Sequence, residues 1–200
     1  MTSPLDARPV VVAVAGPNGA GKTTFCESHL LPAGLRVVNA DDLARELAIG
    51  PYEAAEVAGR IRETLVEQGE SFVFETVFSD PVGDKVAFLK RAAARGYGVV
   101  VCFVGLDGPE ASGERVAMRV MQGGHDVPQE KLEERYPRTL RNLGRAIREL
   151  PHVLVFDNGD LARPFRKVAV YEGGREVEVV PPRPRWLTRA LATGPRRPAR

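Results

Sequence analysis

The stretch "GPNGAGKTT" at residues 16–24 decides the fold of this 200-residue chain. It follows the apolar run "PVVVAVA" at 9–15 and matches the pattern G-x-x-x-x-G-K-[ST], in which backbone N–H groups surround phosphate oxygens. The glycines permit a tight turn, Lys22 reaches the β- and γ-phosphates, and the Thr23 hydroxyl is a ligand for Mg²⁺. The pattern predicts a loop that holds a nucleoside triphosphate. Its nine residues are Gly16, Pro17, Asn18, Gly19, Ala20, Gly21, Lys22, Thr23 and Thr24.

Outward from this loop, short apolar runs alternate with helical patterns. Strands that alternate with helices form a mostly parallel sheet with helices on its faces. We therefore expect an α/β protein with the P-loop NTPase fold, built on a five-stranded, mostly parallel sheet flanked by helices. The predicted strands are 9–15, 35–38, 71–75, 98–104 and 152–156, and the predicted helices are 22–31, 41–48, 52–68, 81–95, 109–121 and 128–149.

The chain divides into one main body and two short C-terminal pieces. Residues 1–165 are expected to form the phosphate-binding domain, with a helical arginine lid at about 115–149. Alternating apolar and polar residues predict a small β-hairpin at 166–180, appended after the core. Residues 181–200 contain six arginines, five prolines and no acid, which favours a poorly ordered tail over a nucleic-acid contact.

Composition narrows the class of protein further. The chain is 44% apolar and 27% charged, with a net charge of +2, as in a soluble globular protein. It has no apolar run of the roughly 18 residues that suggest a membrane span, and the first nine residues lack the apolar core of a secretory signal. We expect a cytoplasmic protein without a membrane partner, in which Cys26 and Cys102 are buried free thiols.

Other classes of nucleotide-binding protein are disfavoured by missing motifs. A transporter-type ATPase needs an LSGGQ-like signature, and a GTPase needs N-K-x-D for guanine; neither occurs here. The chain is also too short to hold the helicase motifs. What remains favours a small kinase, with an acceptor site after the second and third strands and a lid that carries arginines.

The stretch "VVNADDLAREL" at 37–47 supplies the candidate catalytic acid. Phosphoryl transfer to an alcohol needs a carboxylate that orients and deprotonates the hydroxyl, and Asp41 directly follows the second strand. The alternative is that Asn39 or Asp41 caps the helix that begins here. We interpret Asp41 as the base, Asp42 as a first-turn acid, and Asn39 as a substrate contact or supporting partner.

A second carboxylate ends the third strand in "SFVFETVFSD" at 71–80. Glu75 follows an apolar run, where a buried carboxylate is costly without a partner. We expect Glu75 to bind an acceptor hydroxyl or hold the water shell of Mg²⁺, with Thr76 beside the substrate. The alternative is that Glu75 caps a neighbouring loop.

Arginines recur through residues 115–143 on both sides of Gly123-Gly124. Two helices joined at a glycine hinge form a plausible lid, and their arginines can neutralise charge that develops on transferring phosphate. The alternative is a solvated face on which neighbouring glutamates pair with them. Pro137 is expected to interrupt the second helix, and His125 to hydrogen-bond locally. The arginines concerned are Arg115, Arg119, Arg135, Arg138 and Arg141.

The ordered motifs GPNGAGKTT, NADDLA, FETVFS and RVAMRVMQGGHDVPQEKLEERY resemble the zeta-toxin-like group of P-loop kinases. They are most similar to its free-standing bacterial branch, over roughly residues 8–160. Zeta toxins phosphorylate the 3′-hydroxyl of UDP-N-acetylglucosamine with ATP and Mg²⁺. The resemblance implies that Lys22 and Thr23 hold phosphate and metal and that Asp41 is the base. It further implies that Glu75 fills the family's second acidic position and that Arg119 and Arg135 contact phosphate.

The chain also departs from the family pattern. Leu43 and Ala44 stand where the toxins carry an aromatic residue after the catalytic acid, and Glu134 stands where the close branch has a basic residue. The leading hypothesis is a kinase for a hydroxyl of a small molecule, with an antitoxin-like protein as a candidate partner. A polynucleotide or nucleoside kinase and a non-catalytic, ATP-responsive binding module are the alternatives.

Overall fold

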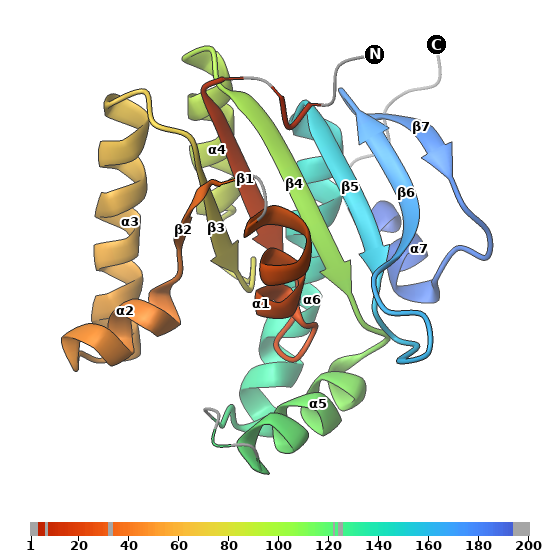
Figure 1. Cartoon of the computed structure of the whole chain (residues 1–200). Helices are drawn as coiled ribbons and strands as arrows, with labels where there is room; N and C mark the ends of the chain where they lie inside the picture. Colours follow the sequence, from red (N-terminus) through yellow and green to blue (C-terminus); the bar gives the residue numbers. More distant parts are fainter. Residues whose placement is uncertain (1–3, 7, 32–33, 122, 124–125, 194–200) are drawn as a thin grey trace.

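The structure is a computed structural model that describes residues 4–6, 8–31, 34–121, 123 and 126–193. Its centre is one mixed sheet in the order β2-β3-β1-β4-β5-β6-β7 (Figure 1). The first five strands in this order are parallel, and the last two are antiparallel to their neighbours. The strands are β1 (Val10–Ala15), β2 (Arg36–Val38), β3 (Phe72–Thr76), β4 (Gly98–Gly105), β5 (His152–Asp157), β6 (Arg166–Glu172) and β7 (Arg175–Val179).

The valine-rich first strand lies at the centre because both of its faces are buried. All six residues of β1 are 0% exposed, which suits a strand between β3 and β4 with helices on each side. The predicted parallel strands and the α/β class are confirmed. The predicted number of five strands is too small, because the described sheet has seven. The hairpin β6–β7 is not a separate appendage. Its first strand pairs with β5 and extends the same sheet.

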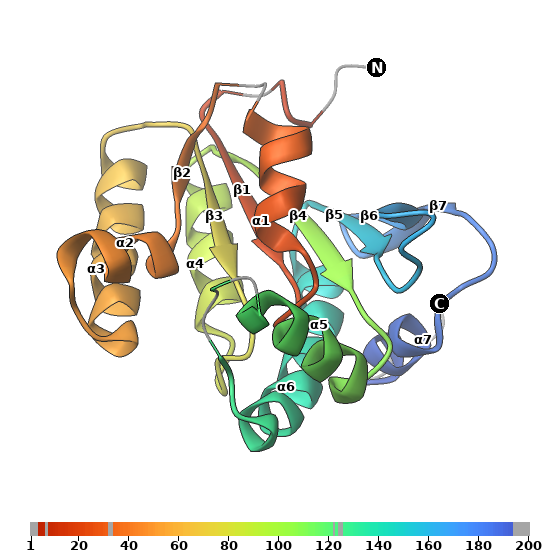
Figure 2. The same cartoon turned by 60° about the horizontal axis from the view of Figure 1, so that its bottom comes forward.

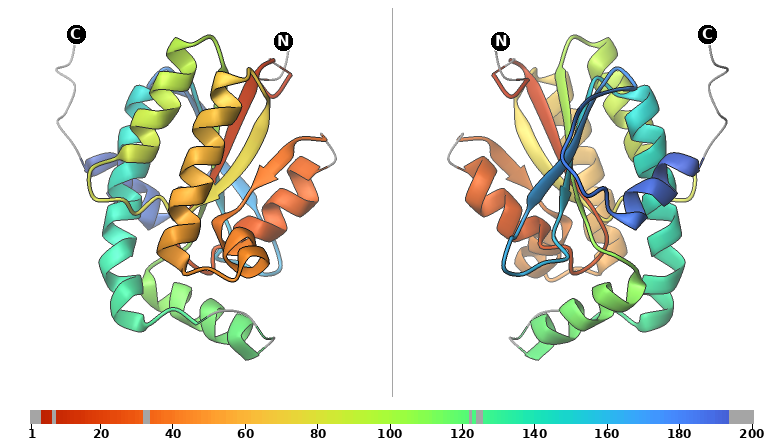
Figure 3. Two further views of the ribbon diagram at one scale, coloured as in Figure 1. Left: turned by 90° about the vertical axis from the view of Figure 1, so that its left-hand side faces the viewer. Right: turned by 90° about the vertical axis from the view of Figure 1, so that its right-hand side faces the viewer.

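Helices cover both faces of the sheet. The segment α1–η1 packs on one face, while α3, α4, α6 and α7 lie on the other (Figures 1 and 3). Figure 2 turns the carboxyl-end edge of the sheet forward, where α2 and α5 lie. The helices are α1 (Lys22–Phe25), the π-helical η1 (Cys26–Leu30), α2 (Ala40–Leu47), α3 (Pro51–Glu67), α4 (Asp84–Ala94), α5 (Pro109–Met121), α6 (Gln129–Glu149) and α7 (Arg185–Ala192).

Two predictions for the helices are wrong. The predicted interruption at Pro137 does not occur, and α6 continues through it. Buried Leu132, Tyr136 and Leu140 pack both halves of the helix against the body, which outweighs the missing N–H at Pro137.

The predicted disorder at 181–200 is also wrong for the part that the structure describes. There α7 forms, and Trp186, Leu187 and Ala190 are each 0% exposed. Burial of these apolar side chains outweighs the proline- and arginine-rich composition around them. Residues 194–200 lie outside the described residues.

In the described part of the chain, no helix is both long and apolar enough to cross a membrane. Cys26 and Cys102 are free and buried, as predicted.

Candidate active site

The phosphate-binding loop leaves the carboxyl end of β1 and enters α1. Gly16 is required by close approach, because a Cβ there would lie 2.0 Å from the carbonyl oxygen of Val104. Its N–H donates to the Thr76 carbonyl at 3.3 Å, which ties the loop to β3. Gly19 has a φ of 73°, a left-handed conformation that favours glycine. At Gly16 and Gly19, therefore, the backbone of the predicted motif favours glycine over any residue with a side chain.

Lys22 lies at the centre of the charges around this loop. Its Nζ donates to the Pro17 carbonyl at 3.0 Å. Burial lowers the pKa of the half-buried Lys22 to about 8, against the opposing effects of the Glu75 and Asp41 carboxylates. Arg119 lowers the pKa of Lys22 further. Lys22 thus feels the charges of three residues that the sequence placed at the site, from β3, α2 and α5.

Glu75 is joined directly to the phosphate-binding loop. The Thr23 hydroxyl donates to Glu75 Oε2 at 3.1 Å. Burial raises the pKa of the Glu75 carboxyl, although Lys22 and hydrogen bonds from Thr23 and Cys26 oppose this rise. A hydroxyl and a carboxylate side by side match the oxygen ligands that Mg²⁺ prefers, directly or through water. The residues present therefore fit a magnesium ion beside the loop.

The residues around the start of α2 divide their roles clearly. Asn39 is the N-cap, and its Oδ1 accepts a hydrogen bond from the Asp41 N–H at 2.9 Å. Asp42 forms an ion pair with Arg45 along the helix. Asp41 is exposed, and its charge acts on Lys22. Because Asn39 caps the helix, the Asp41 carboxylate is not needed for that purpose.

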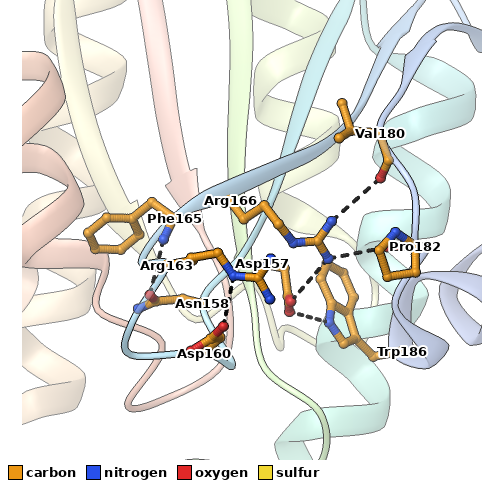
Figure 4. Close-up of polar contacts among 9 residues, drawn as sticks. All are labelled: Asp157, Asn158, Asp160, Arg163, Phe165, Arg166, Val180, Pro182 and Trp186. Atoms are coloured by element: carbon orange, nitrogen blue, oxygen red, sulfur yellow. Dashed lines mark hydrogen bonds and ion pairs between the residues drawn. The ribbon is translucent and has the colours of Figure 1, made fainter.

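One loop contact was not predicted. Asn158, just after β5, is 4% exposed and donates to the Ala20 carbonyl at 2.9 Å. Its Oδ1 accepts from the Phe165 N–H at 3.2 Å (Figure 4). Its carbonyl accepts from Arg115 Nη2 at 2.9 Å. Asn158 therefore ties the phosphate-binding loop to the β5–β6 connection and to α5. Its place directly after a buried strand was the only sequence signal for this role.

The remaining candidate residues have less direct links to the loop. The Thr76 hydroxyl accepts a hydrogen bond from the Phe78 N–H at 3.0 Å, and so stabilises a turn. Arg138 pairs with Glu134 at 2.7 Å, as the solvated-face alternative predicts. Arg135 is half-buried on α6, and in the described part of the chain its side chain has no hydrogen bond to the phosphate-binding loop. His125 lies outside the described residues.

The fold and this site define the class of P-loop nucleotide-binding proteins: a lysine-bearing phosphate loop, carboxylates from two other segments whose charges act on that lysine, and an arginine-bearing helix. The zeta toxin family model matches residues 1–169, and the chain belongs to this family. No curated protein matches the chain by sequence.

Solved structures share the fold at low sequence identity. An AvrRxo1-ORF1:-ORF2 complex with ATP matches at 20% identity and a TM-score of 0.67, covering 87% of this chain and 61% of that one. The PezAT toxin–antitoxin system of Streptococcus pneumoniae matches at 17% identity and a TM-score of 0.58, covering 82% and 72%. The Pnkp1/Rnl/Hen1 RNA repair complex matches at 14% identity and a TM-score of 0.55, covering 88% and 53%. The chain spans about three fifths of the chain that it matches in the AvrRxo1-ORF1:-ORF2 complex.

Proposed function

We propose that the protein transfers the γ-phosphate of ATP to a hydroxyl group of a small molecule, with Mg²⁺ as cofactor. The observation that carries this proposal is the contact of the Glu75 carboxylate with the Thr23 hydroxyl of the phosphate-binding loop, together with the charge of Asp41 acting on Lys22 of the same loop. A module that only binds ATP needs the loop but has no use for a second, exposed carboxylate next to it. This arrangement supports chemistry over simple binding.

The chemistry assigns one task to each side chain. The acceptor oxygen forms a bond to the γ-phosphorus, the bond from that phosphorus to the β–γ bridging oxygen breaks, and ADP leaves. Asp41 orients the hydroxyl and takes its proton. Lys22 and Arg119 neutralise charge on the transferring group, with Arg135 as the second candidate arginine. Thr23 and Glu75 would hold Mg²⁺, which neutralises phosphate charge when bound.

A sugar nucleotide such as UDP-N-acetylglucosamine is the first acceptor to test, because the chain belongs to the zeta toxin family. An antitoxin-like protein is the matching partner, supported by fold similarity to a toxin–antitoxin system. A polynucleotide kinase is the second candidate, since a similar fold occurs in an RNA repair complex.

The test is incubation of the full chain with ATP, Mg²⁺ and a metabolite panel that includes UDP-N-acetylglucosamine, followed by mass spectrometry. A product heavier by one phosphate, absent with Asp41→Asn, is the expected result. Phosphorylation of oligonucleotides alone would favour the second candidate. ATP binding without any phosphorylated product in either panel would contradict the kinase proposal.

A further inference from the structure

A groove of about 760 Å³, lined by many charged residues, lies between α3 and α4, outside the phosphate-binding loop. The two helices run side by side on one face of the sheet (Figure 3). Their facing sides contribute Gly59, Arg62 and Glu63 from α3, and Lys85, Phe88 and Arg91 from α4. The volume is in the range of pockets that hold small molecules.

Arg62 is the buried cation of this groove. It is 8% exposed, and its guanidinium lies over the rings of Phe74 at 5.0 Å and Phe88 at 5.8 Å. Its Nε is buried, and among the described residues it has no hydrogen-bond partner. A buried charge without hydrogen bonds is costly, so the unused donor indicates that a group from outside the chain completes the site.

Lys85 places a second cation against the same groove. Burial lowers the pKa of Lys85, and the nearby Arg62 charge lowers it further. Asp80 and Asp84 oppose this effect. These two carboxylates are at the start of α4, where Asp80 Oδ1 accepts the Asp84 N–H. The two cations therefore act on each other within one groove.

Four of the other charged groups of the groove form ion pairs, whereas Glu67 and Asp84 have none among the described residues. Glu63, the carboxylate that acts on Arg62, forms an ion pair with Arg91 at 2.6 Å. Glu56 forms a longer ion pair with Arg60, at 3.8 Å. No ion pair to Arg62 or Lys85 is found in the described part of the chain. An anion between these two cations would supply the missing acceptor and relieve their mutual repulsion.

We propose that this groove binds the phosphate or carboxylate group of a small molecule between Arg62 and Lys85. Gly59 borders the guanidinium, since a Cβ at this position would lie in ordinary contact with Arg62 Nη2, at 3.6 Å. Two sources can supply the anion: the acceptor of the proposed reaction, or a separate regulatory molecule. The same side chains recognise both.

The test uses the full chain carrying Lys22→Met, without Mg²⁺, so that the phosphate-binding loop contributes least. Inorganic pyrophosphate and citrate are titrated by calorimetry at constant ionic strength. Saturable binding of at least one of them is expected. Lys85→Gln and Arg62→Met should each raise the Kd by about tenfold, the effect of losing one charge-assisted hydrogen bond.

Lys90→Gln is the matched control, because Lys90 is also on α4 but pairs with Glu149 of α6. It should leave the Kd unchanged. Lys85→Gln keeps the test decisive if Arg62→Met disturbs the packing on Phe74. Absence of saturable binding, or equal Kd values in Lys85→Gln, Lys90→Gln and the parent, overturns the proposal. Both outcomes are independent of whether a kinase acceptor is found.

A kinetic measurement separates the two sources of the anion in the chain with Lys22 intact. If Lys85→Gln raises KM for the acceptor and leaves kcat unchanged, the anion belongs to the acceptor. If KM is unchanged while pyrophosphate still binds the groove, the anion belongs to a separate molecule. Either result is consistent with the anion site, and the binding experiment is the one that can contradict it.

Discussion

Lys22 lies in surroundings that disfavour its positive charge when no phosphate is bound. Burial lowers its pKa from 10.5 to about 8, so the protonated lysine costs stability in the chain without nucleotide. At pH 7 the lysine is charged in both the folded and the unfolded chain. Between pH 8 and 10.5 the folded chain loses the proton first, so the stability of the chain rises with pH across this window.

Lys22→Met should therefore have opposite effects on activity and stability. Turnover of ATP should fall by about 10²–10³-fold, the range for loss of one preorganised charge donor. The free energy of unfolding at pH 7 should rise by about 1–2 kcal/mol, and this gain should shrink as the pH goes from 8 to 10.5. Thermal unfolding of both chains across this pH range measures the effect. A variant that is less stable at pH 7 would contradict the account of Lys22.

The neighbouring carboxylates Asp41 and Asp42 should respond differently to the same substitution. Asp41→Asn should lower phosphotransfer by about 10²–10⁴-fold, as expected of a lost general base, while ATP binding persists. Asp42→Asn removes an exposed ion pair with Arg45 and a minor charge effect on Glu75, and should change activity little. Steady-state kinetics and ATP titration of the two variants provide the comparison. Equal activities would show that Asp41 is not the base.

Asn39 allows the capping role to be tested separately from catalysis. Its side chain caps α2 by accepting the Asp41 N–H. Asn39→Ala should lower the free energy of unfolding by about 1 kcal/mol, the usual effect of losing an N-cap. Denaturant unfolding of Asn39→Ala and Asp41→Ala measures this. A larger loss in Asp41→Ala would return the capping role to Asp41.

At the scale of elements, α7 makes the C-terminal segment part of the core. The Trp186 ring packs against that of Phe103, with the ring centroids 5.7 Å apart. Its Nε1 donates to Asp157 Oδ1 at 3.0 Å. Asp157 also pairs with Arg166, which donates to the Pro182 carbonyl (Figure 4). A Cβ at Gly105 would lie 2.2 Å from the indole, so the end of β4 is shaped to receive this ring.

Shortening the chain from its C-terminus should show that α7 belongs to the folded body. Removal of 181–200 should destabilise the body strongly, and Trp186→Ala alone should lower the free energy of unfolding by about 3–5 kcal/mol. Calorimetry of the three chains is the measurement. A melting temperature that stays constant after removal of 181–200 would show that α7 does not support the sheet.

The β5–β6 connection should affect nucleotide binding through Asn158. Asn158→Ala removes the donor to the Ala20 carbonyl and the acceptor for the Phe165 N–H. We expect a loss of about 1–3 kcal/mol in stability and a tenfold rise in the Kd for ATP, because buried partners are left unpaired. The exposed pair Arg163–Asp160 on the same connection provides the control, and Arg163→Ala should change neither quantity appreciably.

Across the whole molecule, the features that neighbouring residues determine could be predicted from the sequence, and those that depend on contacts between distant segments could not. The apolar runs around β1 are local, so the five parallel strands were predicted within one or two residues. The phosphate loop was equally local, because its glycines serve the loop itself. The alternating pattern of 166–180 indicated a hairpin but could not show which sheet edge it joins.

The features that the sequence did not reveal depend on contacts between distant segments. Trp186 meets Gly105 across the fold, and its neighbours in sequence are prolines and arginines typical of a tail. Asn158 is a single polar residue with no motif around it, and only its contact with Ala20 shows its use. For the site, the charges of Glu75, Asp41 and Arg119 all act on Lys22. The catalytic roles proposed for these residues and for Arg135 stay predictions.

A further prediction concerns the stability of the whole fold in the presence of nucleotide. The phosphate-binding loop contacts β3 through Gly16, the β5–β6 connection through Ala20, and α5 through Gly19. A ligand in the loop is thus coupled to elements from most of the chain. ATP with Mg²⁺ at about 100 times its Kd should add about 2.7 kcal/mol to the free energy of unfolding.

For a domain of this size, that gain corresponds to a rise of about 5–10 °C in melting temperature. Thermal unfolding with ATP, with ATP and Mg²⁺, and with neither should give increasing stability from no ligand to ATP to ATP with Mg²⁺. Lys22→Met should abolish most of the ATP-dependent rise, and Glu75→Gln should abolish mainly the additional rise due to Mg²⁺, because Glu75 contacts the Thr23 hydroxyl. If Mg²⁺ raised the melting temperature of Glu75→Gln and the parent equally, the metal would have to be held elsewhere, and Glu75 would be left with the acceptor as its ligand.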